Sequence, residues 1–247
     1  SMSFPIGEQF FIDSVRDGAK QLPPAQRERF AAEIQGFIGQ EATHRRIHDL
    51  FNGHLATQGL VNAWEPRIAR RIRKLNRADV RHRVAVTAAT EHFTAILAEW
   101  VLTHPHALDN TEERLRTMWM WHAAEESEHR STAFDLYRAL GGNDFWRLRW
   151  FRVVTFFFLT DVLRQTVRNL WRDGTLFKLS TWRSGWRYLF GEGGLVRETY
   201  RPWRSYFRAD FHPSQQDDQL SVAWLRYNAG SFRPVSGAAA VVAEPGA

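Results

Sequence analysis

Residues 119–134, WMWHAAEESEHRSTAF, place two histidines and three glutamates among apolar and aromatic side chains. If this stretch is helical, the H-x-x-x-E-x-x-H spacing puts His122, Glu126 and His129 on one face, because residues three and four apart are neighbours on a helix. Glu125 lies at the edge of that face. Imidazole and carboxylate groups arranged in this way are typical ligands of a divalent transition-metal ion.

A second stretch, QEATHRRIH, offers a matching half of such a site. Glu41 and His44 form an E-x-x-H pair whose members again share a helix face. Glu8 in PIGEQFFI and Glu91 in TAATEHFTAI are single glutamates in apolar surroundings. Each half of the expected helix bundle therefore contains a lone glutamate, followed about one helix later by an E-x-x-H pair.

The predicted metal ligands are carboxylates and imidazoles on four expected helices: Glu8, Glu41, His44, Glu91, His122, Glu126 and His129. Four glutamates and two E-x-x-H motifs match the ligand arrangement of di-iron and di-manganese carboxylate bundles. Four carboxylates would neutralise the charge of two divalent cations in a core of low dielectric constant. A single E-x-x-H pair is often an ordinary surface pair, but the repeated pattern favours a metal centre.

Three further residues are expected to support this centre. His48 follows His44 by one helical turn, and we expect it to hydrogen-bond a ligand rather than to bind metal. Glu125 is expected to orient a ligand, with replacement of Glu126 in the ligand set as the alternative. His212 in DFHP is a candidate to reach the metal site from a later loop, and its alternative role is structural.

The elements that must position these residues are helices. Helical patterns cover residues 4–17, 25–53, 79–103 and 111–140, with Gly141 as the stop signal of the last one. No alternating apolar pattern of strand length occurs. The sequence therefore predicts an all-α fold of the ferritin-like type, with an antiparallel four-helix bundle over residues 1–140.

The later part of the chain is expected to add helices to this bundle. A fifth helix is predicted near residues 149–171, with shorter helices at 180–190 and 195–208. Residues 141–230 are interpreted as a basic, aromatic-rich helical extension that packs on the bundle. Residues 231–247 are rich in Ala, Gly and Pro, and they are expected to form a flexible tail.

Charge and composition limit the classes of partner. The chain has no cysteine, which excludes disulfides and thiolate metal sites. Residues 145–210 hold 13 Lys and Arg against 5 Asp and Glu, with many aromatic residues among them. This segment either contacts an anionic membrane surface or folds over the bundle, whereas nucleic-acid binding is not expected without a binding motif. Lack of a secretory signal in the sequence suggests a cytoplasmic, membrane-peripheral location.

The motif WHAAEESEHRSTAFD at residues 121–135 resembles the family described as predicted metal-dependent hydrolases. The ADFHP segment at 209–213 resembles a later segment of that family, and the similarity extends over about residues 4–220. The H-x-x-x-E-x-x-H spacing is also similar to that of the di-iron arylamine N-oxygenases. That second resemblance implies that His122 is an additional ligand beyond the usual six.

Two enzymatic functions are consistent with these residues. The first is an oxidoreductase that activates dioxygen at two iron ions, with manganese as an alternative metal in one or both sites. Glu41 and Glu126 would then bridge the ions, and Glu8 and Glu91 would be terminal ligands. Its partners would be a small, lipid-like substrate and an electron donor. The second function is a hydrolase that uses a water activated by two metals, as the family resemblance implies. A non-catalytic metal store is a third hypothesis, and a homodimer is one expected oligomeric state.

Overall fold

The computed structural model describes residues 1–128 and 130–231, which form helices and loops without any strand. This confirms the predicted all-α class and the additional C-terminal helices. The α-helices are α1 (Phe4–Gln21), α2 (Pro24–Thr57), α3 (Glu65–Leu75), α4 (Val80–Thr103), α5 (Glu113–Glu126), α6 (Thr132–Ala139), α7 (Asp144–Arg172), α8 (Leu179–Phe190), α9 (Leu195–Ser205) and α10 (Gln219–Tyr227). Two short 3₁₀ helices cover Pro105–Leu108 and Pro213–Gln215.

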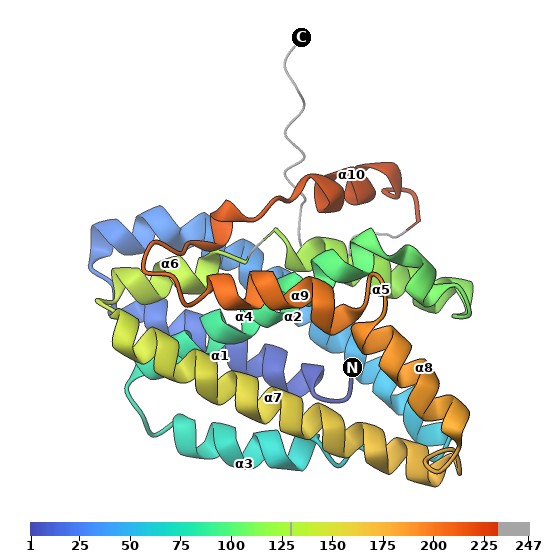
Figure 1. Ribbon diagram of the computed structural model, residues 1–247. Coiled ribbons are helices and arrows are strands. Elements are labelled where there is room, and N and C mark those ends of the chain that lie inside the picture. Colours follow the sequence, from blue (N-terminus) through green and yellow to red (C-terminus); the bar gives the residue numbers. More distant parts are fainter. Residues whose placement is uncertain (129, 232–247) are drawn as a thin grey trace.

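Helix α4 is the central element of the molecule, and α1, α5, α6, α7 and α9 all pack against it (Figure 1). Its buried face carries small residues such as Ala85, Ala88 and Ala89, which allow neighbouring helices to approach closely. Helices α1 and α2 pack side by side and are joined by only Leu22 and Pro23, so they run antiparallel. The bundle that positions the candidate metal ligands consists of α1, α2, α4 and α5.

The prediction of one helix over residues 111–140 is wrong, because α5 ends at Glu126 and α6 begins at Thr132. Ser127 is buried at the end of α5, and serine is a weak helix former. The buried Arg130 donates hydrogen bonds to the backbone oxygens of Gln216 and Asp217. A tertiary contact across the fold therefore accompanies a break in an otherwise helical pattern.

The sequence analysis missed two helices, α3 and α10. In α3, Ile68, Ile72 and Leu75 recur at helical spacing among basic residues, a pattern typical of an amphipathic helix that could have revealed α3. The Gly and Pro residues at 53–66, just before and at the start of α3, instead predicted a break between helices. Helix α10 has only nine residues, and Ser221 is the single buried one, so no buried apolar face marks it.

Helix α7 confirms the predicted fifth helix, although it begins earlier, at Asp144. The side chain of Asn143 accepts a hydrogen bond from the backbone N–H of Trp146, which caps this helix start. Phe151 of α7 and Tyr206 belong to the same hydrophobic core as Phe134. Within the described residues, no helix is both long enough and apolar enough to span a bilayer. Most of the predicted tail, residues 232–247, lies outside the described residues.

Candidate metal centre

Four helices bring carboxylate and imidazole groups together in the interior of the bundle. Helix α1 contributes one glutamate, α2 one glutamate and two histidines, α4 one glutamate, and α5 one histidine and one glutamate. These residues are Glu8, Glu41, His44, His48, Glu91, His122 and Glu126, and all of them are buried. Except for His129, which lies outside the described residues, every predicted metal ligand therefore reaches this one region.

The ligand atoms form overlapping sets in which all atoms lie within 4.8 Å of one another. The four sets are Glu41–Glu91–Glu126, His44–His122–Glu126, Glu8–Glu41–His44 and Glu8–His48–His122. Because neighbouring sets share members, the cluster extends across more than one cation position. A pair of cations bridged by shared carboxylates needs this kind of overlap.

His44 lies between two carboxylates of α5. Its Nε2 atom is 3.0 Å from Oε2 of Glu125, and its Nδ1 atom is 3.3 Å from Oε1 of Glu126. A contact of this kind orients an imidazole ring. His122 approaches the same Glu126 oxygen, with Nε2 at 3.5 Å. Glu125 thus contacts a candidate ligand and belongs to none of the four ligand sets, and its orienting role stays a prediction.

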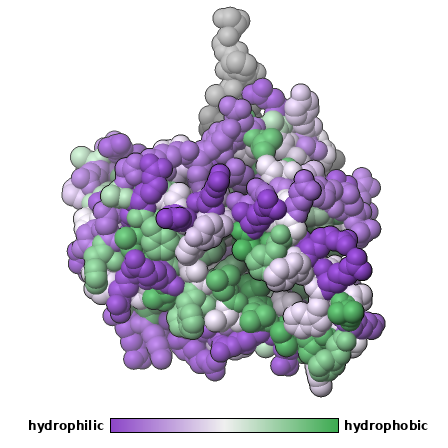
Figure 2. Space-filling view, viewed as in Figure 1, coloured by the Kyte–Doolittle hydropathy of each residue, from purple (hydrophilic) through white to green (hydrophobic). Residues whose placement is uncertain are grey.

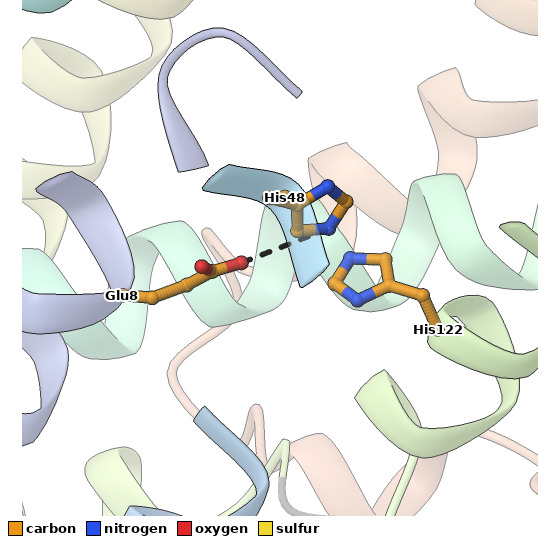
Figure 3. Close-up of side chains that lie close together, drawn as sticks. All are labelled: Glu8, His48 and His122. Atoms are coloured by element: carbon orange, nitrogen blue, oxygen red, sulfur yellow. Dashed lines mark ion pairs between the residues drawn. The ribbon is translucent and has the colours of Figure 1, made fainter. Parts of the chain in front are cut away.

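His48 lies between Glu8 and His122, which approach it from opposite sides (Figure 3). Its Nε2 atom is 3.8 Å from Oε1 of Glu8, and its ring centroid is 4.6 Å from that of His122. The sequence predicts His48 outside the ligand set, but one of its ring nitrogens lies within 4.8 Å of ligand atoms of both Glu8 and His122. The sequence pattern that could have included His48 is the E-x-x-H-x-x-x-H spacing of α2, which puts Glu41, His44 and His48 on one face.

Burial and mutual repulsion disfavour negative charge on the glutamates. Burial raises the pKa of Glu8 to about 8, and the carboxylate of Glu126 acts in the same direction while His44 opposes it. Burial together with the nearby Glu126 raises the pKa of Glu91 well above its ordinary value. Carboxylates packed together in an apolar interior retain protons unless cations neutralise them.

The two buried histidines of α2, His44 and His48, respond to this environment in opposite ways. Burial lowers the pKa of His44 by itself, but its contacts with Glu125 and Glu126 outweigh burial and hold the pKa well above 6.5. Burial and the neighbouring His122 lower the pKa of His48. His48 is therefore neutral, which is the form of imidazole that binds a metal ion.

The Glu8 carboxylate tests whether the cluster fits metal ions. Glu8 is only 3% exposed, and among the described residues neither of its oxygens accepts a hydrogen bond. Burying such a group without a hydrogen bond is costly, whereas coordination of a cation would satisfy its oxygens. The mixed oxygen and imidazole donors suit divalent iron, manganese or zinc. The residues present therefore fit a metal centre.

His212 lies apart from this cluster. Its Nε2 atom is 2.7 Å from Oδ1 of Asp135, and its ring packs edge-on against Phe134. None of the four ligand sets includes it. These contacts hold the loop before Pro213 against α6, which corresponds to the structural alternative for this residue.

A cavity of about 810 Å³ begins at the cluster, where Glu8, His122 and Glu126 form part of its wall. Most other wall residues are apolar, including Phe93, Leu97 and Val154. Thr94 also lines the cavity, whereas Thr87 is buried with its hydroxyl 2.6 Å from that of Ser14. The volume lies within the range of small-molecule binding sites, about 300–1,000 Å³. The candidate metal centre is therefore accessible to an apolar ligand.

The match with a known family covers most of the chain. The family described as predicted metal-dependent hydrolases matches residues 1–217, and the chain belongs to it. This confirms the family resemblance seen in the sequence, and the description of the family agrees with the buried groups that could bind metal. No curated protein and no solved structure gave a significant match.

Proposed function

We propose that this protein is a hydrolase that holds two divalent cations in the buried glutamate and histidine cluster. One observation carries the proposal: seven buried ligand-type residues from α1, α2, α4 and α5 converge next to a deep apolar cavity. The family description agrees with hydrolysis, and it favours this function over the oxidoreductase that the sequence first suggested. His129 remains a proposed ligand on the basis of its spacing alone.

When bound, the cations would supply Lewis acidity and lower the pKa of a water molecule for attack on an ester, amide or phosphoester. The chain's own residues perform three tasks. Glu125 holds the His44 imidazole in position through the 3.0 Å contact. Glu8, His122 and Glu126 line the cavity, so the metal centre faces a substrate bound there. The apolar walls exclude bulk water from the cavity. In this scheme, residues 1–140 hold the centre, and the helical extension closes the outer wall.

The decisive experiment is metal analysis followed by assays of the reconstituted protein. Metal-free protein is loaded under argon with manganese, zinc or ferrous ions and then offered acyl esters and phosphodiesters. We expect about two equivalents of metal per chain, with hydrolysis that depends on them. The Glu91→Gln variant should lose this activity, whereas Glu33→Gln on the exposed face of α2 should retain it. A metal-loaded protein that hydrolyses no substrate in the panel would contradict the proposal.

A second candidate is a di-iron oxidoreductase that activates dioxygen. The mixture of carboxylates and imidazoles on four helices favours it, because ferritin-like di-iron bundles use this donor set. His122 would then correspond to the extra ligand implied by the similarity to the arylamine N-oxygenases. If this function holds, the protein loaded with ferrous iron should consume oxygen in proportion to the amount of iron bound. Prompt oxygen uptake without hydrolysis would reverse the order of the two candidates.

A further inference from the structure

The wall of the cavity is suited to a hydrocarbon chain. Beyond its metal end, the cavity is lined by side chains of α1, α3, α4, α7 and α8, and most of these are aliphatic or aromatic. Phe10, Phe93, Leu97, Val154 and Phe158 are representative of them. A site with polar groups at one end and long apolar walls matches an amphiphile whose reactive group lies at the metals.

The cavity opens between α3, α7 and α8. The wall residues there that are exposed are Lys74, Phe157 and Tyr188, one from each of these helices. Figure 2 shows apolar side chains gathered around a recess on this side of the molecule. Arg71 stacks on Phe157, with its guanidinium carbon 3.9 Å from the ring centroid. The mouth is therefore both apolar and positively charged.

The helices that border the mouth also expose large apolar side chains. We call these the α7–α8 surface, and its members are Phe156, Leu159, Leu163, Trp171, Trp182 and Trp186, each more than half exposed. Isolated exposed apolar residues are common, but a group of this size usually marks a contact surface. The sequence hypothesis that the tryptophans fold over the bundle therefore does not describe Trp171, Trp182 and Trp186.

Charge identifies the kind of partner. Exposed basic residues lie between these apolar side chains on the same two helices: Arg164, Arg168, Arg172, Arg183 and Arg187. Asp161, also on α7, is buried and paired with Arg67 and Arg71. A second copy of the chain would place positive charge against positive charge, which is unfavourable. Tryptophan mixed with arginine is typical of surfaces that bind the interface of an anionic bilayer.

We propose that the α7–α8 surface docks on an anionic lipid bilayer, from which the cavity takes the hydrocarbon chain of an amphiphile. The inference rests on the proposed function, in which the same cavity leads substrate to the metal centre. The reactive group of the amphiphile enters first and reaches Glu8, His122 and Glu126. The hydrocarbon chain of the amphiphile then extends along the apolar wall toward the mouth of the cavity and the bilayer. The substrate class is a lipid ester, amide or phosphoester.

Docking is tested by co-sedimentation of the full chain with vesicles of phosphatidylcholine, alone or mixed with phosphatidylserine. We expect binding to the mixed vesicles only, and we expect high salt to weaken it. Replacing both Arg183 and Arg187 by Gln should lower the partition coefficient roughly thirtyfold, at about fivefold per arginine. The Arg226→Gln variant on α10 is the control and should bind as the wild type does.

The aromatic side chains are tested separately from the charges. The Trp182→Ala/Trp186→Ala double variant should bind the mixed vesicles at least tenfold more weakly than the Tyr227→Ala control, because indole rings favour the bilayer interface. Equal binding by these variants would overturn the docking proposal. So would concentration-dependent dimerisation that the tryptophan double variant abolishes, because the surface would then be an interface between two copies.

Occupancy of the cavity is tested with cis-parinaric acid, whose fluorescence rises in an apolar site. Val154→Trp narrows the cavity and should weaken binding at least tenfold, whereas Val222→Trp on exposed α10 should not change it. Vesicle binding should be the same for both variants. If the folded Val154→Trp variant binds cis-parinaric acid as tightly as the wild type does, the proposal that the cavity binds a hydrocarbon chain is overturned.

Neither the vesicle assay nor the fluorescence assay requires metal or turnover. If the protein binds vesicles and cis-parinaric acid but hydrolyses no substrate, only the proposed function is contradicted. An active hydrolase that binds neither vesicles nor the fatty acid would count against this inference alone.

Discussion

Two buried histidines at similar depth have different surroundings. His48 faces Glu8 and His122 in the cluster. His92 instead lies next to Pro202, with Nε2 3.1 Å from the backbone oxygen, and its ring packs against Tyr206. Burial lowers the pKa of His92 to about 3, so it is a neutral packing residue. Residue type and burial alone do not distinguish a ligand from a structural imidazole.

His48 and His92 give a matched pair of variants. We expect His48→Gln to lower metal affinity at least tenfold, since it removes an imidazole from the Glu8–His48–His122 set. His92→Gln should leave metal affinity unchanged and lower the free energy of unfolding by about 1–3 kcal/mol, since it disturbs a buried hydrogen bond. Metal titration and denaturant unfolding measure the two effects. Equal metal affinities in both variants would exclude His48 from the metal centre.

Asp161 predicts a pH-dependent contribution to stability. Burial alone raises its pKa, but hydrogen bonds from Arg71 and Arg67 outweigh burial and hold the pKa below 3.8. Because the folded-state pKa is the lower one, the stabilisation is complete above pH 3.8 and is lost as pH falls through the folded-state pKa.

Asp161→Asn should therefore lower the free energy of unfolding at neutral pH by about 1.5–3 kcal/mol. The difference from the wild type should shrink as pH falls below 3.8, the ordinary pKa of the group. Urea denaturation across this pH range measures it, with the exposed Asp173→Asn as the control. A difference that stays constant with pH would show that the ion pairs contribute nothing.

At the scale of elements, the position of α1 depends on a glycine. A Cβ atom at Gly18 would lie 3.0 Å from a methyl group of Val84 and 3.2 Å from one of Leu136. Side chains of α4 and α6 therefore pack closely against α1 at this point. Because α1 carries Glu8, the same packing sets how far this ligand reaches toward α2.

Gly18→Val should overpack this contact and lower the free energy of unfolding by about 1–3 kcal/mol. Gly36→Val is the matched control, because nothing lies within 4 Å of a Cβ atom at that exposed position of α2. Its stability should change by less than about 0.5 kcal/mol. Thermal unfolding compares the two variants, and equal melting temperatures would argue against close packing at Gly18.

At the scale of the whole molecule, cations and fold stability are linked. Four buried glutamates repel one another across α1, α2, α4 and α5, and bound cations would remove this repulsion. A ligand that binds only the folded state stabilises it by about 2.7 kcal/mol at a concentration of 100 times its Kd. Bound cations should therefore stabilise the packing of helices that are distant in the sequence.

Treatment with a chelator should lower the melting temperature of the metal-loaded protein, and readdition of the metal should restore it. The stabilisation should be much smaller in Glu8→Gln, which removes one carboxylate from two of the four ligand sets. Differential scanning calorimetry with and without chelator makes the measurement. A melting temperature that does not respond to metal in the wild type would contradict a metal centre that joins the helices.

The sequence by itself determined the helical class, three of the four bundle helices, the approximate start of the fourth, and six of the residues that meet in the cluster. It could do so because residues three and four apart share a helix face, so local spacing reveals a ligand face without knowledge of the fold. Glu41 with His44, and His122 with Glu126, are examples. The family signature at residues 121–135 is equally local.

Only the tertiary structure decided features that depend on contacts between distant segments. Arg130 meets the chain near Gln216, next to the break that ends α5 at Glu126. The inclusion of His48 in the cluster depends on how α2 lies against α1 and α5. The cavity needs walls from α3, α7 and α8, whose relative positions no local pattern encodes. Helical periodicity specifies which face of a helix is apolar, but packing decides which other segment that face meets.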